Sequence, residues 1–340
     1  MERYDVIVLG AGPAGCASAI HCAQQGLKVA IIERHASVRD RPGETLHPGI
    51  EPLLRQLGVA DHVMEAGFMR PTGNWVAWQH TRQFVPFGAD ASGPWRGFQL
   101  PRRALDSLLL ETASDLGVDV RRPCYARRVI LHNRRVTCIH TDQHSLYCDH
   151  LIDASGAHAW LTRQLNLTVH TLSAPLTAFY GYLHTDEHSG RPTEGIFADK
   201  SGWYWVADLG QGRYAWTRLY FVHPKDKTSV VPLPLKGFEH SGRVRGADVT
   251  WRICEPLAGA GYFIAGDAAA TLDPGSSHGV LKALMSGIMA AHGIVQGRAS
   301  PIIQTAVSQQ YRQWVLDGFH HDVRMMREFY RAHPFPPPWL

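Results

Sequence analysis

Two patterns of apolar and polar positions follow one another along the chain, and the first is a βαβ unit. The opening YDVIVLGAGPAG is an apolar run that stops at a glycine-rich turn. Small residues at helical spacing continue to about Gly26, and a second apolar run covers Val29 to Ile32. A strand, a tight turn, a helix and a parallel strand are typical of half a doubly wound nucleotide-binding sheet. The pattern therefore predicts such a domain at the start of the chain.

The second pattern lies between Leu176 and Val222, where short runs rich in aromatic residues are separated by glycine turns. These runs are LTAFYGYLH, EGIFADK, GWYWVADL and RYAWTRLYFV. Aromatic enrichment with hairpin spacing is typical of an antiparallel sheet. We expect this sheet to form a second domain that is inserted into the first.

Weaker signals predict the remaining elements. One predicted helix carries Leu53, Leu54 and Leu57, and another covers the last part of the chain to about His333. The stretch PRRALDSLLLETASDLGVDV predicts a helix followed by a strand. The predicted strands are in residues 72–99, a hairpin of Val129 to His140 with Ser145 to His150, a separate strand LIDASG at 151–156, and the run GYFIAGD. The fold class is therefore α/β, with a Rossmann-type domain, an interleaved antiparallel β-sheet substrate domain and C-terminal helices. The predicted domains are 1–70, 99–165 and 250–333 for the cofactor, 71–98 and 166–249 for the substrate, and 334–340 as a proline-rich tail.

Composition narrows the function classes. The 340 residues are enough for two intertwined domains, and the formal charge of +4 is mild. The arginines are scattered and form no basic stripe with interleaved aromatics, so no nucleic-acid partner is expected. None of the six cysteines has CxxC spacing, and no metal-ligand motif is present. No run reaches the roughly 18 apolar residues of a membrane span, and the first strand begins almost at Met1. We expect a cytoplasmic protein without signal peptide, membrane span or metal.

The glycine-rich turn is the first candidate site. In GAGPAG, Gly10 makes the tight turn, Gly12 lets the backbone approach a pyrophosphate, and Gly15 lets helix and strand pack closely. The start of the helix favours the phosphate charge. Glu33, at the end of the second strand, is placed to bind ribose hydroxyls, and we assign the adjacent Arg34 to the same site. These residues predict a dinucleotide.

The second half of the chain indicates FAD rather than NAD. The run GYFIAGDAAATLDPG ends a strand at Gly266-Asp267, where the carboxylate can bond the ribityl hydroxyls that FAD has and NAD lacks. A turn follows, and then a helix from about Val280, whose first N–H groups can stabilise negative charge on the pyrimidine edge of the flavin. Ser276 and Ser277 are expected to cap this helix. The residues predicted to bind the flavin are Gly266, Asp267, Pro274, Gly275, Ser277, Gly279 and Val280. No Cys or His lies in a flavin-linkage motif, so we expect noncovalent FAD.

These motifs together carry a family resemblance over nearly the whole chain. GAGPAG with Glu33, then Arg103-Ala-Leu-Asp106, DASG at 153–156, and Gly266-Asp267 with DPxxxxG resemble the FAD-dependent aromatic hydroxylases with the p-hydroxybenzoate hydroxylase fold. GETLHP (43–48) and DPGSSHGVLKALMSG resemble the branch of flavin-dependent tryptophan halogenases. That branch includes flavoprotein monooxygenases that hydroxylate a Trp residue during tryptophylquinone cofactor biogenesis, which the second motif resembles most. The resemblance adds Arg103 to the predicted cofactor residues.

The resemblance to halogenases is incomplete at two positions. Halogenases have a lysine beyond the GE(A/S)TxP motif, but no lysine occurs here between Lys28 and Lys200. They also have a WxWxIP strand, and Trp203 to Asp208 keeps both tryptophans of it without Ile-Pro. Arginine does not replace a lysine at such a site, because its guanidinium is a planar, permanently charged fork. Halogenation is therefore disfavoured relative to hydroxylation.

The resemblance implies a reaction and candidate residues for it. Reduced FAD reacts with O2 to form a C4a-hydroperoxide, which transfers oxygen to an indole or phenol. Glu44, His47 and His278 are candidate proton-handling groups, although Glu44 can simply cap the helix near Ile50 and the histidines can simply pack. The candidate substrate residues are Trp75, Trp78, Tyr180, Trp203 and Trp205. We expect an open cleft lined by Trp75 or Trp78, Trp203 and Trp205, with His47 and His278 near the flavin.

The sequence leaves three functions open. The first is hydroxylation of a Trp or Tyr side chain in a peptide or protein partner during quinone-cofactor maturation. The second is hydroxylation of a free aromatic metabolite with NAD(P)H as the reductant. The third, reduction of an unsaturated lipid as in geranylgeranyl reductases, fits an aromatic and polar sheet less well. No dedicated nicotinamide domain is evident, so the external reductant is NAD(P)H or reduced flavin from a partner flavin reductase.

Overall fold

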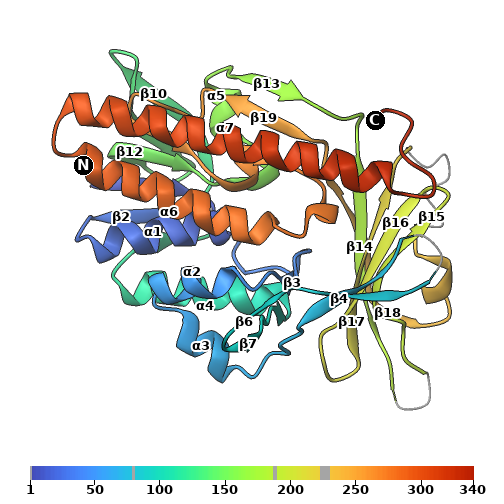
Figure 1. Ribbon diagram of the computed structural model, residues 1–340. Coiled ribbons are helices and arrows are strands. Elements are labelled where there is room, and N and C mark those ends of the chain that lie inside the picture. The colour runs from blue at the N-terminus through green and yellow to red at the C-terminus, as the bar shows by residue number, and fades with distance from the viewer. Residues whose placement is uncertain (1, 79–80, 187–189, 223–229) are drawn as a thin grey trace.

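Two large sheets dominate the computed structural model, which describes residues 2–78, 81–186, 190–222 and 230–340 (Figure 1). The first sheet has eight strands in the order β10-β11-β12-β1-β2-β9, with β21 beside β12 and β20 beside β21. Its strands are β1 (Glu2–Leu9), β2 (Val29–Ile32), β9 (Asp119–Arg121), β10 (Ala126–His132), β11 (Arg135–Thr141), β12 (Ser145–Asp153), β20 (Ala258–Gly259) and β21 (Tyr262–Ile264). Strand β1 pairs in parallel with both β2 and β12. This is the predicted nucleotide-binding topology.

Helices cover this sheet. The helices are α1 (Pro13–Gln24), α2 (Ile50–Gln56), α3 (Ala60–Glu65), α4 (Arg102–Asp115), α5 (Trp160–Gln164), α6 (Gly279–Gly297) and α7 (Pro301–Arg331). Small residues allow α1 and α6 to approach closely, because a Cβ on Gly287 would lie 2.2 Å from the carbonyl oxygen of Ala14. Helix α6 is long and apolar enough to cross a membrane, but it packs between α1 and α7 and most of its residues are buried, as in a core helix.

The second sheet has seven strands in the order β18-β14-β17-β16-β15-β4-β5. Its strands are β4 (Gly73–Ala77), β5 (Gln83–Pro86), β14 (Thr177–His184), β15 (Gly195–Asp199), β16 (Gly202–Asp208), β17 (Arg213–Tyr220) and β18 (Glu239–Asp248). Strand β4 crosses from the first part of the molecule and pairs in parallel with β15 (Figure 1). The smaller sheets contain β3 (Thr45–Leu46) with β8 (Phe98–Gln99), β6 (Ala89–Asp90) with β7 (Gly93–Pro94), and β13 (Thr168–Thr171) with β19 (Arg252–Glu255) and β22 (Ala270–Thr271).

The predicted fold class is confirmed, but two element predictions are wrong and one strand was missed. The run Val129 to His140 is two strands, because Asn133 and Arg134 take positive φ angles of 50° and 62° and form a turn between β10 and β11. LIDASG is not a separate strand, since β12 continues through it to Asp153. Strand β18 was not predicted, because its sequence EHSGRVRGAD is polar and shows no alternation.

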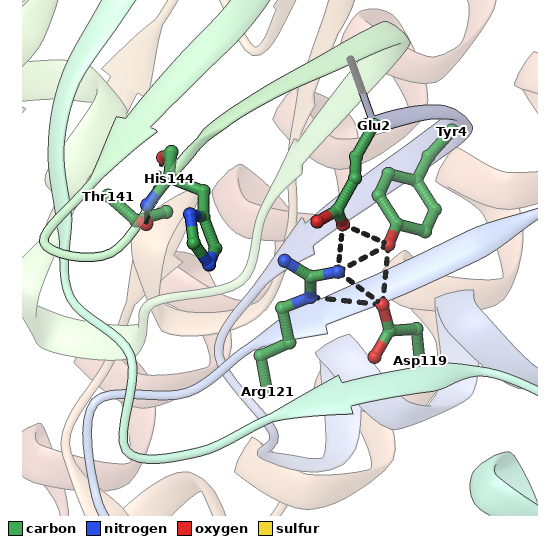
Figure 2. Close-up of polar contacts among 6 residues, drawn as sticks. All are labelled: Glu2, Tyr4, Asp119, Arg121, Thr141 and His144. Carbon is green, nitrogen blue, oxygen red and sulfur yellow. Dashed lines mark hydrogen bonds and ion pairs between the residues drawn. The ribbon is translucent and has the colours of Figure 1, made fainter.

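The edge of the eight-stranded sheet carries a polar cluster around Arg121, shown in Figure 2. The guanidinium forms ion pairs with Glu2 and Asp119 and donates to the Tyr4 hydroxyl. Glu2 and Tyr4 lie at the start of β1, whereas the glycine-rich turn follows the end of that strand. The cluster therefore ties the start of β1 to the edge strand β9, which is separated from β1 by β2.

Candidate functional site

A cavity of about 1220 Å³ lies between the carboxyl ends of the parallel strands and one face of the seven-stranded sheet. Residues after β1, β2, β12 and β21 line it, which is where ligands bind in open α/β sheets. It is open along a rim of exposed residues: Arg34, Arg127, His158, Arg245, Gly246 and Asp248. The volume exceeds the roughly 300–1,000 Å³ of ordinary ligand pockets, so it has room for a large cofactor together with a substrate.

The glycine-rich turn forms one end of this cavity, and its three glycines have different surroundings. Gly10 has φ of +101°, and a Cβ on it would lie 2.4 Å from the Ala154 carbonyl oxygen. A Cβ on Gly15 would lie 1.9 Å from the Gly10 carbonyl oxygen, and Gly15 does not line the cavity, so it serves close packing. A Cβ on Gly12 would meet no atom of the described residues within 4 Å. The backbone at Gly12 and the uncapped start of α1 therefore face open space.

Glu33 holds the turn in place while it lines the cavity. Its two carboxylate oxygens accept hydrogen bonds from the backbone N–H groups of Ala11 (3.0 Å) and His35 (2.8 Å). Arg34 is exposed on the rim beside it. Both predicted residues are thus at the cavity, and the carboxylate is fixed by backbone donors before any ligand binds.

The structure does not bring Arg103 to the cavity. Arg103 is exposed on the outer side of α4, whereas the preceding residue, Arg102, is buried and lines the cavity. Arg102 forms an ion pair with Asp106 at 2.8 Å and donates to the Pro42 carbonyl. Successive helical residues point about 100° apart, so only one of the two arginines can face inward. The sequence motif could not decide which.

The predicted flavin turn is a short 3-10 helix, Pro274–Ser276, followed by α6. The expected serine caps are wrong. The Asp273 carboxylate caps the 3-10 helix by accepting from Gly275 N at 2.9 Å, and α6 starts at Gly279 after His278 without any side-chain cap. Ser277 instead takes a φ of +54°. Pro274, Gly275, Ser277, Gly279 and Val280 all line the cavity, so the free N–H groups at the start of α6 are available to a ligand.

Asp267 follows the strand β21 as predicted and faces the cavity. Its side chain is exposed, but to the cavity rather than to open solvent, and this enclosure raises its carboxyl pKa. The positive charges of Arg102, Arg252 and Arg41 oppose that rise. Gly266 has φ of +62°, and its N–H donates to Ser286 Oγ, which fixes the strand to α6.

Glu44 is buried at the cavity wall and does not cap α2, whose N-cap is Gly49. Its carboxyl accepts a hydrogen bond of 2.6 Å from the hydroxyl of Tyr182 on β14. Burial raises the Glu44 pKa to about 7, although the Tyr182 hydrogen bond opposes the rise. The pair links the GETLHP turn to the substrate sheet, and its carboxyl can change protonation near neutral pH.

His47 and His278 are neighbours, with ring centroids 5.1 Å apart and the rings edge to face. His47 lines the cavity, whereas His278 does not. The N–H of Gly49 donates to His47 Nδ1 at 3.0 Å, so neutral His47 carries its proton on Nε2. Burial lowers the pKa of both histidines, to about 4 for His278, where the positive charges of His47 and Lys282 contribute further.

One row of side chains across the seven-stranded sheet forms the opposite wall. Strand register places its members directly beside one another: Arg245, Tyr180, Thr217, Trp205, Ile196 and Val76. All six line the cavity, and Trp203 lines it from the next row. The row runs from a cation at the sheet edge through polar and aromatic groups to aliphatic ones. A flat aromatic ring can pack against its centre.

Two predicted substrate residues are elsewhere. Trp75 is 38% exposed and packs against Phe84 and Arg82 on the outer side of β4. Successive strand residues point to opposite faces, so Asn74 and Val76 line the cavity in its place. Trp78 is buried against Phe329, with ring centroids 4.2 Å apart, and does not line the cavity. The expected cleft therefore keeps Trp203 and Trp205 but not Trp75 or Trp78.

Comparison with known proteins identifies the family. The family described as FAD binding domain matches residues 3–219. The chain belongs to this family. It is 27% identical to a 1H-pyrrole-2-carbonyl-[peptidyl-carrier protein] brominase of Pseudoalteromonas luteoviolacea (strain 2ta16), over 97% of this chain and 86% of that protein. Its fold is similar to the myxobacterial chondrochloren halogenase CndH (TM-score 0.87, 22% identity, 98% and 84% of the chains) and to PqsL of Pseudomonas aeruginosa (0.80, 14%, 95% and 94%).

This FAD-binding family member is an FAD-dependent oxidoreductase of the superfamily that contains flavin monooxygenases and halogenases. The cavity fits the cofactor on its own evidence. Thr45 Oγ1 and Arg39 Nε are buried without a hydrogen-bond partner among the described residues, and both residues line the cavity. Gly12 and Gly279 leave space where a side chain would project. Unpaired donors beside two exposed helix starts suit a dianionic pyrophosphate and a flavin ring.

The family member also has site residues that its sequence did not reveal. These are Arg102, Asn74, Thr217 and Ile196 on the cavity wall, and Asp273 beneath the flavin turn. The Asp-Pro-Gly sequence was a detectable sign for Asp273, since Asp commonly caps such turns. Thr217 carried no such sign, because strand alternation alone does not tell which face a cofactor will cover.

Proposed function

We propose that this protein is an FAD-dependent monooxygenase that hydroxylates an indole or phenol ring, in a Trp or Tyr side chain of a peptide or protein. The observation that carries the proposal is the composition of the cavity. It joins an FAD cradle to a wall with Tyr180, Trp203 and Trp205, and none of its described lining residues is a lysine. An aromatic wall suits an aromatic substrate, and the missing ammonium group argues against directing a hypohalous acid.

The overall chemistry sets what the chain must supply. When bound, FAD that has received two electrons from NAD(P)H or a reduced flavin would supply the activation of O2. One oxygen atom would then enter the ring, and the other would leave as water with two protons. The protein must hold the ring beside the flavin, exclude water and move protons. Glu44 suits the last task, because its raised pKa lets it take up or release a proton near neutral pH. His47 offers an Nε2–H at the cavity wall.

The substrate size is inferred from the shape of the cavity. The open rim includes residues of the substrate sheet, Arg245 and Asp248, as well as Arg34 and Arg127. A chain segment can approach through such an opening, and the partner itself would then complete the exclusion of water. In its most specific form, the proposal is that this hydroxylation is a step in the maturation of a quinone cofactor in the partner protein.

Halogenation is the second candidate, because the brominase relative covers nearly the whole chain. Two features of halogenases are missing here: the described cavity lining contains no lysine, and the strand from Trp203 lacks Ile-Pro. A direct competition between oxygen and halide transfer therefore separates them.

The experiment supplies FAD-loaded protein with isotopically labelled O2, bromide and chloride, and either NADPH or chemically reduced FAD. Peptides with a central Trp or Tyr, the free amino acids, and an unsaturated isoprenoid lipid are offered separately, and products are identified by mass spectrometry. Labelled oxygen in a peptide ring supports the proposal. A halogenated ring contradicts it, oxygen in the free amino acids alone favours the metabolite hydroxylase, and a saturated lipid favours the reductase.

A matched variant tests the assigned proton role. Glu44→Gln keeps the size of the side chain and its capacity to accept from Tyr182, but it cannot ionise. We expect it to retain FAD and to lose hydroxylation by about 10²-fold or more, the usual worth of a general acid or base. Wild-type turnover in this variant would remove Glu44 from the mechanism.

A further inference from the structure

A buried carboxylate without a cationic partner lies directly beneath the flavin turn. Asp273 is fully buried, and within the described parts of the chain no Lys, Arg or His forms an ion pair with it. Its oxygens accept from Trp251 Nε1 (2.6 Å), Tyr330 OH (2.7 Å) and Gly275 N (2.9 Å). A carboxylate in this environment is costly to ionise.

The turn does not need an ionisable residue at position 273 in order to fold. An N-cap needs one acceptor for the N–H of Gly275, and a neutral Asn or Ser supplies that as well as Asp. Here two further donors come from segments far along the chain, at positions 251 and 330. The three donors lower the Asp273 pKa, and burial still leaves it raised to about 6, so the group is ionised at neutral pH.

The C-terminal end of α7 is the main anchor of this carboxylate. Tyr330 is fully buried, donates to Asp273, and accepts from Trp203 Nε1 at 2.9 Å. Trp203 and Asp273 both line the cavity, one from the substrate wall and one from the flavin turn. Helix α7 runs along the molecule to reach the second sheet at this point (Figure 1). The hydrogen-bond chain Trp203–Tyr330–Asp273 thus joins substrate wall, C-terminal helix and flavin turn.

We propose that the Asp273 carboxylate, held in place by the positioning residues Tyr330 and Trp251, tunes the bound flavin and makes it harder to reduce. Reduction adds electrons to the ring, and a fixed negative charge in a poorly solvated site opposes the added charge. The carboxylate therefore counteracts the free N–H groups at the start of α6, which favour negative charge. This proposal depends on FAD binding and not on the hydroxylation proposed above.

The test is the midpoint potential of bound FAD as a function of pH, in wild type and in Asp273→Asn, measured by spectroelectrochemical titration. Above about pH 7 we expect the Asn variant to be reduced more easily, by about tenfold or more in the ratio of reduced to oxidised FAD at a fixed potential. Towards about pH 5 the difference should vanish, because the wild-type carboxyl becomes protonated. Equal potentials at all pH values would overturn the proposal.

Other titrating groups are present in both proteins and cancel in the comparison. Tyr330 is the titratable group in contact with Asp273, and its pKa lies well above its usual value because of burial and the Asp273 charge. His47 at the cavity wall and its neighbour His278 have lowered pKa values. Asp61→Asn, which removes an exposed carboxylate on α3, is the matched control and should leave the potential unchanged.

A second variant keeps the proposal testable if Asp273→Asn does not fold. Tyr330→Phe keeps the charge but removes one donor to it, so the pKa of Asp273 should rise. The pH at which the flavin potential changes slope should move upward by a measurable amount, while FAD stays bound. An unmoved profile in folded, FAD-loaded Tyr330→Phe would contradict the proposal. None of these measurements requires a substrate, so they are independent of whether any ring is hydroxylated.

Discussion

Replacing Glu44 by Gln should change the pH dependence of stability in a defined direction. Glu44 is buried, and its pKa is raised from 4.5 to about 7. Each pKa unit corresponds to about 1.4 kcal/mol, so ionising Glu44 in the folded protein costs about 3 kcal/mol more than in the unfolded chain. Because the pKa of Glu44 is higher in the folded than in the unfolded protein, the protonated carboxyl stabilises the fold. This stabilisation is fully present below about pH 4.5 and is lost as the pH rises towards 7. Glu44→Gln has no such loss.

The assay is denaturant unfolding of both proteins at a series of pH values and a fixed, saturating FAD concentration, since the cofactor stabilises the folded state by mass action. The free energy of unfolding of Glu44→Gln minus that of wild type should increase by about 3 kcal/mol between about pH 4.5 and about pH 8. Other buried carboxyls, such as Asp153, contribute equally to both proteins and cancel.

Tyr182→Phe supplies the complementary test. The Tyr182 hydroxyl donates to the carboxyl and lowers its pKa, so its loss should raise that pKa and move the decline in stability to higher pH. Parallel pH profiles for wild type and Glu44→Gln would refute the reasoning, because they would show that Glu44 ionises as readily in the folded protein as in the unfolded chain.

Four further predictions concern FAD binding and the cavity wall formed by the seven-stranded sheet. Gly12→Val should fold normally, since a Cβ there meets nothing within 4 Å, but should lose FAD, as judged by circular dichroism and by flavin absorbance after gel filtration. Acid or heat denaturation of wild type should release all the flavin; flavin that stays on the chain would disprove noncovalent binding. Arg102→Ala should weaken FAD binding by about tenfold or more in fluorescence titration, whereas Arg103→Ala should not. Trp205→Ala should raise the substrate KM by about tenfold, while Trp75→Ala, on the outer face, should leave it unchanged.

Local signals were sufficient for the nucleotide-binding unit. The strand Val29–Ile32 has the bounds that its apolar run predicted, and α1 begins at Pro13, inside the glycine-rich motif. Four strands of the substrate sheet, β14 to β17, follow their aromatic runs closely. These features depend on neighbouring residues only: a turn needs glycine, a helix start needs free N–H groups, and a half-buried strand alternates.

Orientation was the first property that the sequence left open. Alternation gives β4 two faces, but only its pairing with β15 turns Val76 towards the cavity and Trp75 away from it. The same holds for α4, where packing decides that Arg102 faces inward and Arg103 outward. The side-chain period of an element is local, whereas the face that becomes buried depends on the layer packed against it.

The pairing of distant groups was the second property that the sequence left open. The sequence by itself determined the FAD cradle, because its glycines and acidic residues lie in short motifs whose backbone geometry is local. It could not determine that Glu44 meets Tyr182, 138 residues away, or that Tyr330 reaches Asp273 across 57 residues. Such contacts exist only after both sheets and the C-terminal helix have packed together, and the raised pKa values of Glu44 and Asp273 arise from that burial. The sequence therefore decided which cofactor is bound, and the tertiary structure decided the electrostatic environment in which it works.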